Sequence, residues 1–146
     1  MIAKQGLEKW HQAVRNMSPE ALDDLLAEDV VFHSPVVHTP QEGKALTTMY
    51  LLAAFNVFPG TKKSDAGAPV VEKAKSPFQY VREVVGDSDA VLEFTTVIDE
   101  IRVNGVDMIR WNEDGKIIEF KVMIRPLKAI QKIHAQMGAM LASMKS

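Results

Sequence analysis

The sequence predicts an α+β fold in which helices come first and an antiparallel sheet follows. Up to about residue 57 the apolar residues recur mainly at helical spacing. From residue 78 onward they occur in four short runs separated by tight-turn sequences, and a last amphipathic segment follows. A chain of 146 residues is expected to form a single domain, residues 1–146, large enough for a core and one internal pocket.

Three helices are predicted in the first part of the chain. The first covers residues 7–17, where four apolar residues recur at helical spacing. The second begins at Ser18, because serine is a good N-cap and the proline that follows is tolerated at the first helical position. A short strand over residues 29–35 ends in proline. The third helix begins near Gly43 and ends at a Pro-Gly pair at 59–60.

The second part of the chain predicts a sheet. Residues 61–77 lack periodicity, and both a lid or binding loop and a plain crossover remain open for them. Asn104-Gly105 lies between β-branched residues, which is a strong signal for a two-residue hairpin turn. A final helix from residue 127 carries an apolar stripe that must cover the sheet, the pocket mouth or a second subunit. The four expected strands are Phe78–Val85, Val91–Val103, Val106–Trp111 and Lys116–Ile124.

A turn at Asn104-Gly105 would fix the register of the sheet. It predicts Arg102 opposite Asp107 and Ile98 opposite Trp111. A four-residue turn at 112–115 would place Asp107 beside Phe120, with Val122 and Ile124 on the same face. The other face is mixed, as expected for a solvated surface or a dimer contact. The expected inner face contains Thr96, Ile98, Glu100, Arg102, Asp107, Ile109 and Trp111.

Asp107 is the most informative residue of this sheet. It shares its predicted face with Ile109 and Trp111, and a carboxylate in apolar surroundings costs several kcal/mol, roughly, unless it is paired, hydrogen-bonded or protonated. Two interpretations stay open: a cross-strand ion pair with Arg102, or a chemical role.

Composition excludes several classes of function. The net charge is −2 and the basic residues are dispersed, so no nucleic-acid partner is expected. No apolar run is long enough to span a membrane, and the N-terminus lacks the apolar core of a signal peptide. The absence of cysteine removes disulfides, thiolate nucleophiles and cysteine-ligated zinc. A cytoplasmic location is the default expectation.

The whole chain resembles the nuclear transport factor 2-like superfamily, which includes ketosteroid isomerases and SnoaL-like cyclases. Residues 106–112 with 115–118 are similar to the isomerase strand pair that bears the aspartic acid of the oxyanion hole, and Asp107 matches that acid. Residues 29–35 resemble the strand of the general base, and the Phe-His-Ser-Pro motif at 32–35 is similar to that of uncharacterised bacterial members. The resemblance implies a cone-shaped, curved antiparallel sheet wrapped around the N-terminal helices, an extra C-terminal helix, and a homodimer.

The chain departs from the isomerase pattern at the position of the base. That position holds Ser34, which cannot abstract a carbon-bound proton without a base of its own. His33 or His38 could take over, because imidazole titrates near neutrality, although strand alternation puts His33 on the face opposite Ser34. Arg102 beside Asp107 would favour the ionised acid rather than the protonated donor.

Two functions therefore remain open. One is a cofactor-independent acid/base enzyme of isomerase, dehydratase, cyclase or hydrolase type, with Asp107 and His33 or His38 as its catalytic groups. The other is a non-catalytic ligand-binding or accessory domain, in which the charged residues merely pair. In either case we expect a small hydrophobic ligand, and a homodimer formed through the sheet face and the C-terminal helix.

The pocket wall is expected to include residues from several elements. No carboxylate completes a metal site with His33 and His38, so neither a metal nor a cofactor is expected. His11 and His134 lie in helical segments and are interpreted as surface or interface residues. The candidate ligand-binding residues are Phe32, Ser34, Tyr50, Thr96, Ile98, Arg102, Ile109, Trp111, Phe120, Val122 and Ile124.

Overall fold

The computed structural model describes residues 2–16, 19–57 and 78–145. The expected loop or lid at 61–77 lies outside the described residues, as does the Ser18 cap. The elements are α1 (Ile2–Asn16), α2 (Pro19–Leu25), β1 (Leu26–His33), β2 (Gln41–Glu42), α3 (Lys44–Val57), β3 (Gln79–Val85), β4 (Asp89–Ile98), β5 (Ile101–Trp111), β6 (Ile117–Arg125) and α4 (Leu127–Lys145).

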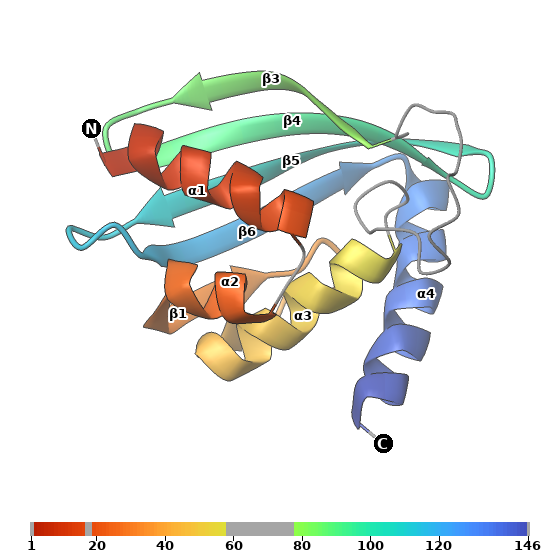
Figure 1. The fold of residues 1–146 in the computed structure, drawn as a ribbon. Helices are drawn as coiled ribbons and strands as arrows, with labels where there is room; N and C mark the ends of the chain where they lie inside the picture. The colour runs from red at the N-terminus through yellow and green to blue at the C-terminus, as the bar shows by residue number, and fades with distance from the viewer. Residues whose placement is uncertain (1, 17–18, 58–77, 146) are drawn as a thin grey trace.

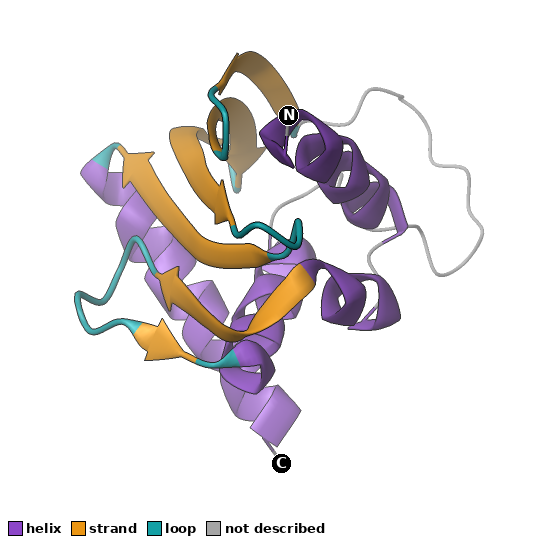
Figure 2. Cartoon of the chain, turned by 90° about the vertical axis from the view of Figure 1, so that its left-hand side faces the viewer, coloured by secondary structure: helices purple, strands orange, loops and turns teal. Residues whose placement is uncertain are grey.

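The six strands form one curved sheet in the order β2-β1-β6-β5-β4-β3. Neighbouring strands are antiparallel except β1 and β6, which run parallel, so the sheet is mixed and not purely antiparallel as expected. In Figure 1, α1 crosses the face of the sheet and α4 stands at the end where β6 finishes, packed against α3. The rotated view shows the strands curling around the helices, which gives the predicted cone-like α+β fold (Figure 2).

The concave face of the sheet carries the core. Strand β4 alternates strictly, with every second residue buried and the residues between them more exposed. The buried residues are Ala90, Leu92, Phe94, Thr96 and Ile98. Helix α1 inserts Trp10, whose ring centroid lies 4.9 Å from that of Phe120 on β6. The aromatic residues of helices and sheet therefore meet at the centre of the cone.

The β4–β5 hairpin turns at Asp99-Glu100, so the predicted turn at Asn104-Gly105 is wrong. Asp99 and Glu100 both have positive φ angles, 49° and 70°, as a two-residue type I′ turn requires. Gly105 lies inside β5 opposite Phe94. A Cβ atom on Gly105 would come within 2.5 Å of the Phe94 Cζ atom, so glycine is needed here for a close approach of side chain to backbone, and not for a turn.

The correct turn changes the partners of Asp107. Asp107 lies opposite Leu92 on β4 and Val122 on β6, rather than opposite Arg102 and beside Phe120. Arg102 pairs with Val97 and is exposed on the convex face. The predicted Asp107–Arg102 ion pair is therefore wrong, because the two side chains lie on opposite faces of the sheet.

Two further register predictions are also wrong. Ile98 lies opposite Ile101 and not opposite Trp111, and Glu100 belongs to the turn rather than to the inner face. Thr96, Ile98, Ile109 and Trp111 do lie buried on the predicted inner face. Moving the turn by five residues shifts the cross-strand partner of Asp107 by ten residues, from Arg102 to Leu92. Ten is an even number, so the face of Asp107 stays right while its partner is wrong.

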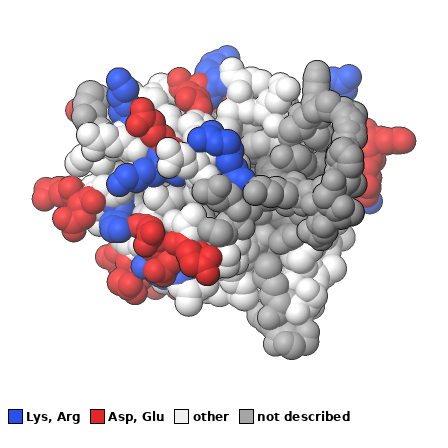
Figure 3. All heavy atoms as spheres, viewed as in Figure 1, with Lys and Arg blue, Asp and Glu red and all other residues white. Residues whose placement is uncertain are grey.

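The convex face of the sheet is mixed, as expected. Its charged residues form pairs, such as Arg82 with Glu93 at 3.4 Å, while exposed apolar residues such as Met123 lie between them. Figure 3, which views the side of the helices, shows basic side chains next to acidic ones, with groups of acidic side chains at the left and lower left. No helix among the described residues is long and apolar enough to cross a membrane.

Candidate functional site

A pocket of about 240 Å³ lies between the concave face of the sheet and helices α1, α3 and α4. Its wall is mainly aromatic and aliphatic, which suits a small hydrophobic ligand. Eight of the ten aromatic residues of the chain contribute to it: Trp10, Phe32, Tyr50, Phe55, Phe78, Tyr80, Phe94 and Phe120.

Asp107 is the only carboxylate among the described residues of this wall. It lies in the middle of β5 and is 6% exposed. The Tyr80 hydroxyl donates a hydrogen bond to the Oδ2 atom of Asp107 over 2.7 Å. The indole Nε1–H of Trp10 in turn donates to the Tyr80 hydroxyl over 3.2 Å. Three side chains from α1, β3 and β5 thus form one hydrogen-bonded chain.

Burial governs the protonation of Asp107 and Tyr80. Loss of hydration raises the pKa of Asp107 to about 7, although the hydrogen bond from Tyr80 acts in the opposite direction by stabilising the carboxylate. Burial and the neighbouring Asp107 raise the pKa of Tyr80 as well, so the phenol stays protonated and remains a donor. No lysine or arginine pairs with Asp107 in the described part of the chain.

A carboxyl group with a pKa near 7 can act in two ways at neutral pH. When protonated, it donates a hydrogen bond to a ligand oxygen. When ionised, it accepts a proton as a general base. The geometry therefore supplies one proton-exchanging group in an apolar pocket.

Comparisons with known proteins identify the family of this chain. Residues 7–120 match the sequence model of the SnoaL-like domain. The chain belongs to the SnoaL-like family. A search of curated protein sequences finds no match.

Solved structures agree with membership of the SnoaL-like family and place the fold in the nuclear transport factor 2-like superfamily. A steroid delta-isomerase from Pseudomonas aeruginosa is 32% identical, with a TM-score of 0.81 over 98% of this chain and 93% of that one. An uncharacterised bacterial protein with a cystatin-like fold from Silicibacter pomeroyi is 28% identical, with a TM-score of 0.75 over 92% and 83% of the two chains. An NTF2-like protein of unknown function from Mesorhizobium loti shares the fold at 16% identity and a TM-score of 0.64, over 86% and 92%.

Tyr80 is the functional residue that sequence reasoning missed in this SnoaL-like chain. Strand β3 has an irregular register between Tyr80, which lies opposite Phe94, and Arg82, which lies opposite Glu93. Such an irregularity changes the direction of side chains along a strand. The available signal was the spacing of Phe78 and Tyr80, two aromatic residues on one face of a strand, but their meeting with Asp107 depends on β3 lying beside β4.

The structure brings together seven of the predicted site residues. Phe32, Ser34, Tyr50, Asp107, Phe120, Val122 and Ile124 line the pocket. Five further ligand-binding candidates fall elsewhere in the described structure. Arg102 is exposed on the convex face, whereas Thr96, Ile98, Ile109 and Trp111 are buried outside the pocket wall.

Neither predicted catalytic histidine reaches the pocket. His33 lies beside Glu119 of the convex face, with its Nε2 atom 3.1 Å from the Glu119 Oε2 atom. His38 is exposed in the loop after β1 and does not belong to the described pocket wall. Strand alternation explains the outward direction of His33, since Ser34, the next residue, lines the pocket.

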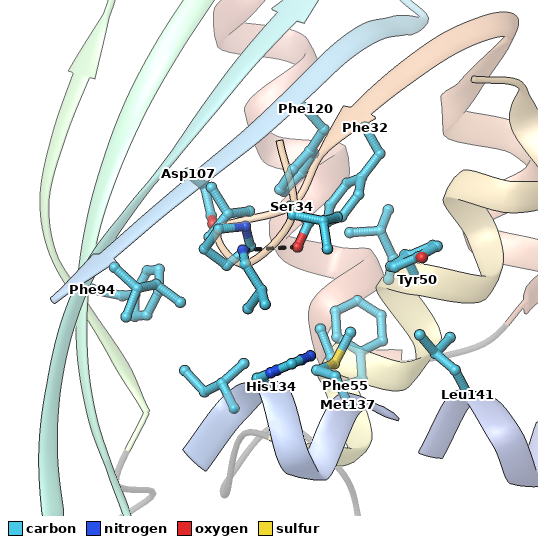
Figure 4. A pocket seen from close by; sticks show the side chains of 18 of the residues that line it. Phe32, Ser34, Tyr50, Phe55, Phe94, Asp107, Phe120, His134, Met137 and Leu141 are labelled. Atoms are coloured by element: carbon cyan, nitrogen blue, oxygen red, sulfur yellow. Dashed lines mark hydrogen bonds between the residues drawn. The ribbon is translucent and has the colours of Figure 1, made fainter. Parts of the chain in front are cut away.

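Ser34 and His134 are the other polar residues that matter in this SnoaL-like pocket. The Ser34 Oγ atom accepts a hydrogen bond from the Val36 amide over 3.0 Å, which holds the loop after β1 at the pocket wall (Figure 4). His134 is exposed, in agreement with the expected surface position, and it also contributes to the pocket wall from α4. No group of three or more His, Asp and Glu side chains within the described ranges could hold a metal ion.

Proposed function

We propose that this protein is an isomerase-type enzyme that moves a proton within a small hydrophobic carbonyl compound. The observation that carries this proposal is Asp107 in the wall of an aromatic pocket, bonded to Tyr80 and facing no cation in the described structure. Such a strongly shifted acid in a pocket is typical of a functional site. The similarity to a steroid delta-isomerase supports the same class of reaction.

Asp107 serves as the proton carrier in this proposal. Its carboxylate takes a proton from the carbon beside the carbonyl group, and the electron pair of the broken C–H bond passes into an enolate. The Asp107 carboxylic acid then returns the proton to a different carbon of the conjugated system, so the double bond moves and no net oxidation occurs. A pKa of about 7 suits both halves of this cycle.

Ser34 has a different part from the base found at its position in ketosteroid isomerases. Its oxygen already accepts the Val36 amide hydrogen, and its own hydroxyl hydrogen has no acceptor among the described residues. We assign that hydrogen to the carbonyl oxygen of the substrate, where it would stabilise the developing negative charge. In ketosteroid isomerases the base lies at the position of Ser34 and the hydrogen-bond donor at the position of Asp107. In this proposal the two roles are exchanged between these positions.

The first experiment tests turnover and the role of Asp107 together. Wild-type protein is mixed with 3-cyclohexen-1-one, and the absorbance of the conjugated enone product is followed. The rate should rise with pH through about 7, and Asp107→Asn should lower it by roughly 100-fold or more. Asp99→Asn, a change in the exposed β4–β5 turn, is the matched control and should keep the wild-type rate. Equal rates for wild type and Asp107→Asn would contradict the proposal.

A second candidate, non-catalytic ligand binding, is supported by the hydrogen bonds that join Trp10, Tyr80 and Asp107 to one another. Fluorescence titration with 2-naphthol, a flat hydroxylated ring that imitates an enol, distinguishes the two functions. Asp107-dependent binding of 2-naphthol without isomerisation of the ketone would favour the binding function.

We also propose a homodimer formed through the convex sheet face and α4. Supporting it are exposed apolar side chains in these places, among them Met123 on β6, 52% exposed, and Leu127 at the start of α4, 66% exposed. Light scattering should give twice the monomer mass, and Met123→Lys should shift the mass toward the monomer. A wild-type monomer over a wide concentration range would refute the dimer.

A further inference from the structure

Helix α4 brings a polar side chain to the pocket on the side opposite Asp107. His134 belongs to a stripe of α4 that faces the pocket and is otherwise apolar, with Ile133, Met137 and Leu141. Figure 4 shows the imidazole rising from α4, across the pocket from Asp107 on β5. The ring makes no hydrogen bond or ion pair within the described part of the protein, and the residue is exposed.

Gly138 leaves free space beside this histidine. It lies one helical turn after His134, in the same stripe of the pocket wall. A Cβ atom on Gly138 would meet no atom within 4 Å. Glycine is less favourable than alanine inside a helix, and the backbone of Gly138 requires no left-handed conformation. The open space therefore has no local conformational cause, and it extends the pocket along α4.

The charges of the pocket wall decide which ligand suits this space. The described wall contains no lysine or arginine, so His134 is its only potential cation. Asp107 is the only carboxylate, and burial favours its neutral form by raising its pKa. An anionic group near α4 would thus meet a hydrogen-bond donor on His134 and little opposing charge. Imidazole carries an N–H donor in both of its protonation states.

We propose that His134 and Gly138 form a subsite for a carboxylate group of the ligand, at the end remote from Asp107. The proposal rests on the proposed function, because it takes the reacting end of the ligand to lie between Asp107 and Ser34, with the ligand oxygen at the Ser34 hydroxyl. It narrows the substrate class to flat hydrophobic acids that carry a carbonyl or enol oxygen at one end and a carboxylate at the other.

Three fluorescent probes of the same ring system test this subsite. The first is 2-naphthol, which has only the hydroxyl group for the Asp107 end. The second is 6-hydroxy-2-naphthoic acid, which adds a carboxylate at the far end. The third is 6-hydroxy-2-naphthamide, which has nearly the same shape as the acid but no charge. We expect wild-type protein to bind the acid about tenfold more tightly than the amide, as a charge-assisted hydrogen bond would give.

Variants of the subsite separate charge from shape. His134→Ala should weaken binding of the acid about tenfold and change binding of the amide and of 2-naphthol by less than about twofold. His134→Lys should restore binding of the acid. Gly138→Phe should fill the space beside His134 and weaken both six-substituted probes, while 2-naphthol still binds. His38→Ala, outside the described pocket wall, is the control for the loss of a histidine and should leave all three affinities unchanged.

The outcomes distinguish this inference from the proposed function. If 2-naphthol binds in an Asp107-dependent way but the acid binds no better than the amide, the carboxylate subsite is refuted while the proposed function stands. An unchanged affinity for the acid in His134→Ala would refute it equally. If 2-naphthol itself fails to bind, the proposed function fails, and the subsite fails with it.

Discussion

The two faces of the sheet hold their charged residues in opposite ways. On the convex face Glu119 lies 3.1 Å from His33 and 3.9 Å from Arg110, so its carboxylate has two basic neighbours in contact with solvent. On the concave face Asp107 is buried, and its hydrogen-bond partner is the neutral hydroxyl of Tyr80. A carboxylate side chain thus has basic partners on the convex face and no cationic partner on the concave face.

This difference indicates which face has a functional role. Exposed ion pairs contribute little to stability, typically about 0–1 kcal/mol, and need no further explanation. A buried carboxylate without a cation costs far more, roughly several kcal/mol, and its pKa shifts toward neutrality instead. A fold retains such a group at a cost in stability, which is why we assign chemistry to the concave face. The following predictions test this contrast.

Replacement of Asp107 by asparagine should have the largest effect. The pKa of Asp107 rises from 3.8 in the unfolded chain to about 7 in the folded protein. The folded state therefore holds a proton that the unfolded state has lost, and stability should fall as the pH rises from about 4 to about 7. The loss is on the order of 4 kcal/mol, from about 1.4 kcal/mol per pKa unit. Asp107→Asn should lack this pH-dependent loss of stability.

Urea unfolding of both proteins over this pH range measures the effect. The difference in free energy of unfolding between Asp107→Asn and wild type should grow in favour of the variant up to about pH 8. Asp99→Asn, an exposed acid near Lys132, is the control and should show only a small change. A pH-independent difference for Asp107→Asn would show that Asp107 is ionised at little cost.

Replacement of Gly105 by alanine tests the register that separates Asp107 from Arg102. The added methyl group would meet the Phe94 ring at 2.5 Å and the Met123 carbonyl oxygen at 2.8 Å. We expect a loss of about 2–3 kcal/mol in the free energy of unfolding, as for overpacking in a core.

Gly138→Ala is the matched control, because its methyl group meets open space, and it should gain about 0.5–1 kcal/mol. A loss of only about 1 kcal/mol in Gly105→Ala would instead fit a glycine at a turn, where the cost is conformational. Denaturant unfolding of the three proteins gives this comparison.

Replacement of Tyr80 by phenylalanine tests how much its hydroxyl lowers the pKa of Asp107 on the concave face. The hydroxyl stabilises the ionised form of Asp107, so its removal should raise the pKa of Asp107 above 7. The indole N–H of Trp10 also loses its acceptor, with a cost of about 1–2 kcal/mol. NMR titration of the Asp107 carboxyl carbon measures the pKa. A lower pKa in Tyr80→Phe would contradict the assigned direction of the hydrogen bond.

Replacement of Glu119 by glutamine should have the smallest effect. Its contacts with His33 and Arg110 lie in partial contact with solvent, so the loss of charge should cost less than about 1 kcal/mol. Ketone isomerisation should be unchanged, because His33 does not belong to the described pocket wall. A large loss of activity would return His33 to the list of candidate catalytic groups.

Local patterns in the sequence were sufficient for the helices and most strands, but not for β2 or for the turn between β4 and β5. Helical spacing located α1 and α3, and strict alternation placed Ile109 and Phe120 on the concave side. The face of Asp107 followed from the same alternation. These features depend on neighbours a few residues apart, and such neighbours are visible in a linear chain.

The partners across the sheet could not be read in this way. Asn104-Gly105 has the composition of a turn, yet its glycine serves a close approach by Phe94, and the turn is formed by Asp99-Glu100. The turn error of five residues shifted the cross-strand partner of Asp107 by ten residues, an even number. The face of Asp107 was therefore correct, whereas its neighbours were wrong. The alternation of residues along a strand shows which side chains share a face, but it does not show which residues of two strands lie opposite each other. The opposite residues depend on which turn closes the hairpin with the better packing.

The sequence by itself determined the superfamily, the α+β order of elements, and a buried Asp107 beside an apolar pocket. Only the tertiary structure decided that Tyr80 and not Arg102 bonds to Asp107, that His33 faces outward, and that His134 on α4 faces the pocket. The physical reason is the same in each case. Burial and alternation follow from residues that are near in sequence, whereas the pKa of Asp107 and the charge of the pocket depend on side chains from β3 and α4, which only the folded chain brings together.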